Sequence, residues 1–156
     1  MKLAELETAL LDALRTAPAL AYLKTVEPAS DRSFDRATGN FIVVPPAALT
    51  LLLSAQLRSR DLVARTYDYA PRFLVFAVAR NLRSVRAEKF GGAAPEEIGA
   101  YQMLDDLKRT LAGLRLTLPS AGSRPVVALA AERLESFTPD FSAYSLELVV
   151  RGNFHV

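Results

Sequence analysis

The segment Arg72–Arg80 constrains the fold most, because apolar side chains occur on both faces of a β-patterned run. In an extended strand, successive side chains point to opposite faces of the sheet. One face carries Phe73, Val75, Ala77 and Ala79, and the other carries Leu74, Phe76 and Val78. Such a strand is typical of a sheet that is covered on both sides. We therefore expect Arg72–Arg80 to be a central strand.

Two amphipathic helices are predicted, one before and one after this strand. Residues 2–16 place leucines at three- and four-residue steps, as a helix with one buried face requires. A second helix is expected over about residues 95–112, with Pro95 in its first turn and Gly113 as a left-handed C-terminal cap. The expected buried stripes are Leu3, Leu6, Leu10 and Leu14 in the first helix, and Ile98, Tyr101, Leu104, Leu107 and Leu111 in the second.

Further strands are predicted from shorter patterns. Residues 21–27 and 41–44 are β-patterned, and Pro45-Pro46 places the second of these at an edge or an entry kink. Residues 48–58 fit neither helix nor strand periodicity cleanly, and their short length favours a strand. Residues 124–135 and 143–150 are separated by a turn and predict an antiparallel pair. In the last segment Ser145, Glu147, Val149 and Arg151 are expected to face water.

These elements predict one α+β domain over residues 1–156. The sheet is expected to be mostly antiparallel or mixed, with the N-terminal helix and the second helix packed on it. The polar stretch from Ser30 to Asn40 is expected to be an exposed, mobile excursion. A chain of 156 residues, of which 51% are hydrophobic, can bury a core of its own.

The sequence contains no convincing catalytic or metal-binding constellation. It has no cysteine, and its one histidine, His155, lies next to the C-terminus, which leaves no Ser-His-Asp triad and no multi-histidine zinc site. Adjacent acids such as Asp105 and Asp106 point about 100° apart on a helix, and Asp31 with Asp35 lacks the rest of an EF-hand loop. We therefore expect no catalytic residue, no metal, no cofactor and no enzyme activity.

The N-terminus and the apolar runs argue against a membrane protein. Acidic residues stand where a signal peptide needs an apolar region, and no apolar run reaches the about 20 residues of a membrane span. We therefore expect a soluble chain that is cytoplasmic when made.

Basic residues gather between positions 58 and 89, and we call this stretch the basic band. It contains eight basic residues against three acidic ones: Arg58, Arg60, Arg65, Arg72, Arg80, Arg83, Arg86 and Lys89, against Asp61, Asp68 and Glu88. One interpretation is an ordinary solvated face. The other is a surface for a partner subunit or for a nucleic-acid backbone, because arginine pairs well with carboxylate and phosphate. Gly91 and Gly92 follow the band as a loop.

Four segments resemble the Mu-like phage tail-completion or tail-terminator family. They are Leu23–Pro28, Phe76–Arg83, Gly99–Leu107 and Tyr144–Leu148, so the resemblance touches most of the chain. Ser84 stands where a glycine commonly follows the Asn-Leu-Arg element of that family. The resemblance implies a tail-terminator-like fold without enzyme activity, and a hexameric ring that caps the head-proximal end of a tail tube.

The same resemblance implies partners and a location. The partners would be further copies of the chain, the tail tube protein, and the sheath and head-tail connector proteins. DNA would pass through the ring without being bound specifically. The loops around residues 30–40 and 84–94 would lie on the ring faces, with Arg58, Arg60, Arg65, Arg80, Arg83, Arg86, Lys89, Gly91 and Gly92 as candidate interface residues. The protein would reside in the virion tail, and in the host cytoplasm before assembly. The alternative function is a nucleic-acid-binding module that uses the basic band.

Overall fold

The computed structural model describes residues 2–35, 37–38, 40–61, 63, 65–80, 91–92, 97–119 and 124–155. Its helices are α1 (Leu3–Thr16) and α3 (Ala100–Leu111), with short 3-10 turns at Pro18–Leu20 and Asp31–Ser33. Its strands are β1 (Thr25–Pro28), β2 (Ala47–Asp61), β3 (Thr66–Arg80), β4 (Val126–Phe137) and β5 (Phe141–His155). No helix in this described part is long and apolar enough to cross a membrane.

The strands form one sheet in the order β1-β2-β3-β5-β4. Only the short β1 runs parallel to its neighbour, and every other pairing is antiparallel. β3 occupies the middle, which confirms the central strand predicted from its two apolar faces. The mixed α+β fold with two helices on a sheet is likewise confirmed.

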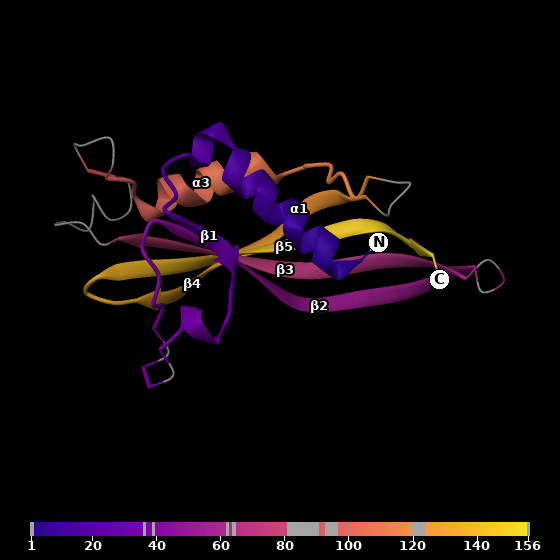
Figure 1. The fold of residues 1–156 in the computed structure, drawn as a ribbon, viewed down its shortest axis with the longest axis horizontal. Coiled ribbons are helices and arrows are strands. Elements are labelled where there is room, and N and C mark those ends of the chain that lie inside the picture. The colour runs from indigo at the N-terminus through magenta and orange to yellow at the C-terminus, as the bar shows by residue number, and fades with distance from the viewer. Residues whose placement is uncertain are drawn as a thin grey trace.

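Both faces of β3 are buried, but different segments cover them. Both helices lie on one face, where Leu6, Leu10 and Leu14 of α1 and Leu107 of α3 join Phe73 of β3 in a common core (Figure 1). The other face holds a smaller core, in which Phe76 and Val78 of β3 contact Phe34, Phe41 and Leu49. The predicted excursion at residues 30–40 is therefore partly buried, since Phe34 packs in this core and Ser33 is 1% exposed.

Several predicted boundaries were wrong. The strand expected over residues 21–27 shrinks to β1, and the strand expected at residues 41–44 is only an isolated bridge between Phe34 and Phe41. The second helix begins at Ala100, so Ile98 precedes it. Its buried face includes Met103, which is 0% exposed, whereas Tyr101 is 37% exposed. The helical period is unchanged, but the buried stripe is rotated toward Met103.

The β4–β5 hairpin confirms the predicted antiparallel pair and its turn. Tyr144, Leu146, Leu148 and Val150 contact the core beneath the helices, as expected. The expectation of a wet opposite face was wrong at Ser145 and Glu147, which are 1% and 5% exposed. They are buried because neighbouring strands supply polar partners for both side chains.

Candidate assembly surface

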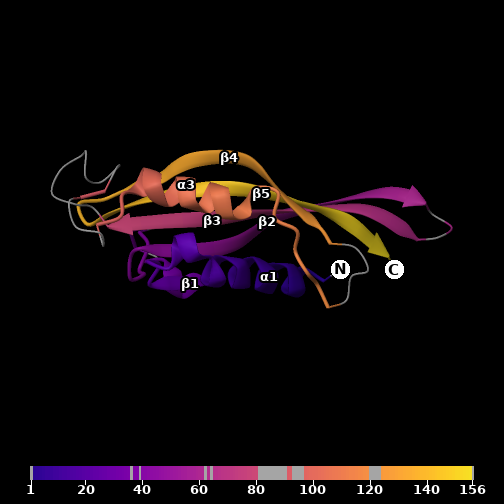
Figure 2. The same cartoon turned by 90° about the horizontal axis from the view of Figure 1, so that it is seen from above.

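The far half of β2 leaves the core and is exposed along its whole length. Ala47–Thr50 are buried, whereas every residue from Leu51 to Asp61 is exposed. We call this outer part, Leu51–Asp61, the distal edge. Four of its side chains are large and apolar: Leu51, Leu52, Leu53 and Leu57. Figure 2 shows the β2–β3 hairpin extending past the ends of both helices, so the helices do not cover it.

The distal edge is also unpaired on its outer side within the described residues. β1 pairs with β2 only from Ala47 to Thr50, and β3 pairs with the other side of β2. The backbone N–H and C=O groups of an unpaired strand edge form a template on which another strand can pair. The sequence did not reveal this edge, because nothing in the chain's pattern shows that β1 is so short.

The structure separates the predicted arginines. Arg58, Arg60 and Arg65 lie at the tip of the β2–β3 hairpin and are exposed. Arg80 is at the opposite end of β3, twelve residue steps or about 40 Å from Asp68, the partner of Arg58. Arg72 lies between them and is ion-paired with Glu147. Arg83, Arg86 and Lys89 lie outside the described residues. The described arginines of the basic band are thus spread along the sheet, with three at one end, an arrangement that does not favour the nucleic-acid interpretation.

Gly91 and Gly92 make a close backbone approach to the segment that precedes α3. The N–H of Gly92 donates to the carbonyl oxygen of Glu97 over 2.9 Å. Gly91 has a φ of 89°, and a Cβ added there would lie 2.7 Å from the same carbonyl oxygen. A side chain at Gly91 would be strained by both the backbone conformation and the contact. The observed role of the two glycines is therefore structural, and their predicted role at an interface stays a prediction.

A second unpaired edge lies on the opposite side of the sheet. β4 is the last strand, and its beginning is covered by the segment after α3, where Val127 donates to Leu114 over 2.9 Å. From Ala128 to Phe137 no described residue pairs with its outer side, and we call this stretch the β4 edge. It exposes large apolar side chains, with Leu134 at 56% and Phe137 at 62%. These apolar residues in the otherwise polar second half of β4 were the signal available in the sequence.

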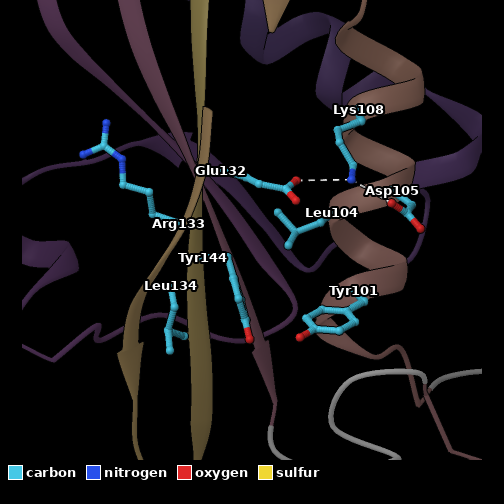
Figure 3. Close-up of a pocket in the computed structure, with 8 residues that line it drawn as sticks. All are labelled: Tyr101, Leu104, Asp105, Lys108, Glu132, Arg133, Leu134 and Tyr144. Atoms are coloured by element: carbon cyan, nitrogen blue, oxygen red, sulfur yellow. Dashed lines mark ion pairs between the residues drawn. The ribbon is translucent and has the colours of Figure 1, made fainter. Parts of the chain in front are cut away.

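A cleft of about 320 Å³ lies between α3 and β4 beside this edge. Lys108 spans it, with its Nζ 2.9 Å from Asp105 and 3.2 Å from Glu132 (Figure 3). Hydrogen bonds to Asp105 and then to Glu132 raise the pKa of Lys108. Tyr101 and Tyr144 meet edge to face at the other end, with ring centroids 6.0 Å apart. Burial raises the pKa of the Tyr144 phenol.

The cleft has no arrangement suited to catalysis. Its lysine is held as a cation by two carboxylates, whereas a lysine nucleophile or base needs a lowered pKa. Across the described residues, no group of three or more histidine, cysteine, aspartate or glutamate side chains could hold a metal ion. The arrangement can instead fix α3 against β4 and so shape the surface beside the β4 edge.

Glu147 joins three strands on the face that the helices do not cover. Its side chain is 6% exposed, and each carboxylate oxygen accepts a hydrogen bond of 2.8 Å. One donor is Arg72 of β3 and the other is Arg133 of β4. This charged bridge ties the β4 edge to the middle of the sheet. Sequence reasoning missed it, because it treated Glu147 as part of a wet face.

Three comparisons with known proteins bear on the chain. The model of the family described as "Bacteriophage Mu, Gp37" matches residues 2–148. No curated protein matches the chain significantly in sequence. Among solved structures, the chain is similar in fold to a chain from the "Virion of native gene transfer agent (GTA) particle", at 13% identity and a TM-score of 0.59. That similarity covers 97% of this chain and 96% of the other.

Proposed function

We propose that this chain, which belongs to the bacteriophage Mu Gp37 family of phage structural proteins, is a tail terminator. In this role several copies form a ring on the head-proximal end of a tail tube and stop tube polymerisation. The family match over residues 2–148 supports a phage structural protein, and the resemblance to tail-completion proteins supports the terminator role. The described parts of the segments that resemble tail-completion proteins lie in and just before β1, in β3, in and just before α3, and in β5. They therefore belong mainly to the sheet and to the helix packed on it.

The geometry supports an assembly role rather than a chemical one. Two long strand edges, the distal edge and the β4 edge, lie on opposite sides of the sheet, and no strand of the described part of the chain covers them. Exposed edges of this length promote uncontrolled association unless a partner covers them. A ring covers them, since head-to-tail contacts that close on themselves leave no free edge.

The proposal assigns partners and a place in the particle. The tube protein meets one ring face, and the head-tail connector or sheath meets the other. The ring is hexameric in this proposal, DNA passes through its lumen, and the protein resides in the virion tail. The arginine cluster of Arg58, Arg60 and Arg65 is a candidate contact with acidic neighbours, because arginine pairs strongly with carboxylates.

A tube-length assay tests the function. The tail tube protein proposed as its partner is polymerised with and without the purified chain, and tube lengths are measured by negative-stain electron microscopy. We expect shorter tubes that carry extra density at one end, with the effect saturating at one ring per tube. Serum albumin at equal concentration is the control. Unchanged tube lengths with bare ends would contradict the proposal.

A further inference from the structure

We infer that the distal edge of β2 pairs, as an antiparallel strand, with the β4 edge of a neighbouring copy. The sheet then continues from one copy to the next. This inference rests on the proposed function, because a ring needs one contact that repeats between two different surfaces of the same chain. It names those two surfaces, which the family match does not.

The two edges match in length and availability. Among the described residues, about ten on each edge have no strand paired to their outer side, Leu51–Arg60 on β2 and Ala128–Phe137 on β4. Each strand is covered only at its beginning, by β1 in one case and by the segment after α3 in the other. On both edges, backbone N–H and C=O groups therefore have no partner strand among the described residues. The opposite edge of a neighbouring copy can supply that strand.

The order of strands fixes the direction of pairing. β2 is antiparallel to β3, β3 to β5, and β5 to β4, so β2 and β4 of one copy run in opposite directions. A rotation about an axis roughly along the strands leaves these directions unchanged in the next copy. The junction between neighbouring copies is therefore antiparallel, the same pairing that β2, β3, β5 and β4 use within one copy.

The covered end of β2 fixes a stagger. Ala47 lies level with Ser136 across the sheet, through Val78 and Ala143. A neighbour placed at the same height would therefore push its β4 edge against β1. Sliding the β4 edge about six residues, or about 20 Å, toward the hairpin tip brings it opposite the distal edge. Tilted, staggered strands of this kind are what a closed sheet requires.

Side-chain chemistry agrees with this direction and stagger. Antiparallel pairing brings the apolar beginning of the distal edge, where Leu53 is 49% exposed, beside Leu134 and Phe137. It brings Arg58, near the other end, toward the exposed carboxylate of Glu132. Within the described residues Arg58 makes no ion pair of its own, so its charge is available. Antiparallel pairing of the distal edge with itself over its full length would instead set Arg58 opposite Ser54 and Arg60 opposite Leu52. Neither arginine would then face a carboxylate, so a two-fold dimer lacks this charge complementarity.

Site-specific cross-linking tests the junction cleanly, because the chain contains no cysteine. Ser54→Cys and Leu134→Cys place one thiol on each edge, and both positions are exposed. A short bis-maleimide is added to the double variant, alone and with tube protein. We expect a ladder of covalent oligomers that is lost when either cysteine is reverted. Ser54→Cys with Thr8→Cys, on the exposed side of α1, is the matched control and should give no ladder.

The outcomes separate the inference from the function. Homodimers of the single Ser54→Cys variant would overturn the inference in favour of a two-fold contact. If rings cap tubes but no ladder of covalent oligomers forms, the inferred junction is wrong and the terminator function stands. A ladder in a protein that leaves tube length unchanged would support the inference and contradict the function. Circular dichroism of each variant confirms that the fold is intact.

Discussion

At the residue scale, Glu147 shows how this sheet stabilises a charged side chain that is almost inaccessible to solvent. Both of its oxygens are hydrogen-bonded to arginines that reach in from the strands on either side, so the carboxylate is fully paired. Removing one member of such a pair leaves a buried charge without compensation. The arginines are 41% and 62% exposed, so solvent screens part of this cost.

We expect Glu147→Gln to lower the free energy of unfolding by about 2 kcal/mol, because two charge-assisted hydrogen bonds weaken together. Urea denaturation followed by circular dichroism measures the change. Glu132→Gln is the matched control on the neighbouring strand. Glu132 is 52% exposed in its pair with Lys108, so its replacement should cost under about 1 kcal/mol. If both variants lost the same free energy of unfolding, burial of Glu147 would not strengthen its ion pairs.

Tyr22 supplies a pH-dependent contribution. Its hydroxyl donates to Asp106 Oδ2 over 3.1 Å and ties the segment after α1 to α3. Burial, then the charge of Asp106 and this hydrogen bond, raise the pKa of the phenol well above its ordinary value of 10.0. Because the folded pKa is raised, the stabilisation is complete below about pH 10 and is lost as the pH rises further.

We therefore expect Tyr22→Phe to be less stable than the native chain by about 1 kcal/mol at pH 8, since one hydrogen bond is lost. The difference in stability between the two chains should shrink between pH 10 and pH 11.5. In this range Tyr22, whose ordinary pKa is 10.0, ionises in the unfolded native sequence, and the phenylalanine variant has no such group. Urea titrations of both chains across this range give the comparison. A difference that stays constant with pH would count against the tie between Tyr22 and Asp106.

At the element scale, periodicity predicted the strongly patterned elements and failed where a partner decided the outcome. β3 could be predicted from its own sequence, because both of its faces are apolar, and both contribute to a buried core. Leu104, Leu107 and Leu111 of α3 are buried as predicted, but Met103 is buried where Tyr101 was expected. These two residues flank the same stripe, and only packing distinguishes them. The partners that bury Glu147 lie 75 and 14 residues away, beyond the reach of a period-2 pattern.

The end of α3 allows a test of the predicted glycine cap. Gly113 has a φ of 71°, and a Cβ added there would meet nothing within 4 Å. Gly113→Ala therefore changes only the backbone preference, and we expect a loss of about 1 kcal/mol. Gly113→Asn should lose less, because asparagine tolerates the left-handed region. Thermal unfolding of the two variants gives the order, and an alanine variant as stable as the native chain would contradict it.

At the scale of the whole molecule, the candidate surface depends on which edges the fold leaves open. The sequence predicted the basic band as one stretch, but β3 places two of its described members, Arg58 and Arg80, toward opposite ends of the sheet. Open edges are a property of strand order and of the shortness of β1, and neither can be read from local patterns. Leu57 and Leu134 lay within predicted strands, but the sequence did not show that their side chains are exposed beyond the core.

Charge exchange between the two edges provides a prediction for the whole molecule. Arg58→Glu should weaken self-association by roughly tenfold, because like charges at positions 58 and 132 then approach each other across the junction. Adding Glu132→Lys to the same chain should restore association, since the attraction is re-formed with its sign reversed. Sedimentation velocity over a concentration series measures both effects. The Glu132→Lys chain without the arginine change is the control and should be as weak as the first variant. Failure of the double exchange to recover association, in a chain whose circular dichroism is native, would place the copy-to-copy contact elsewhere.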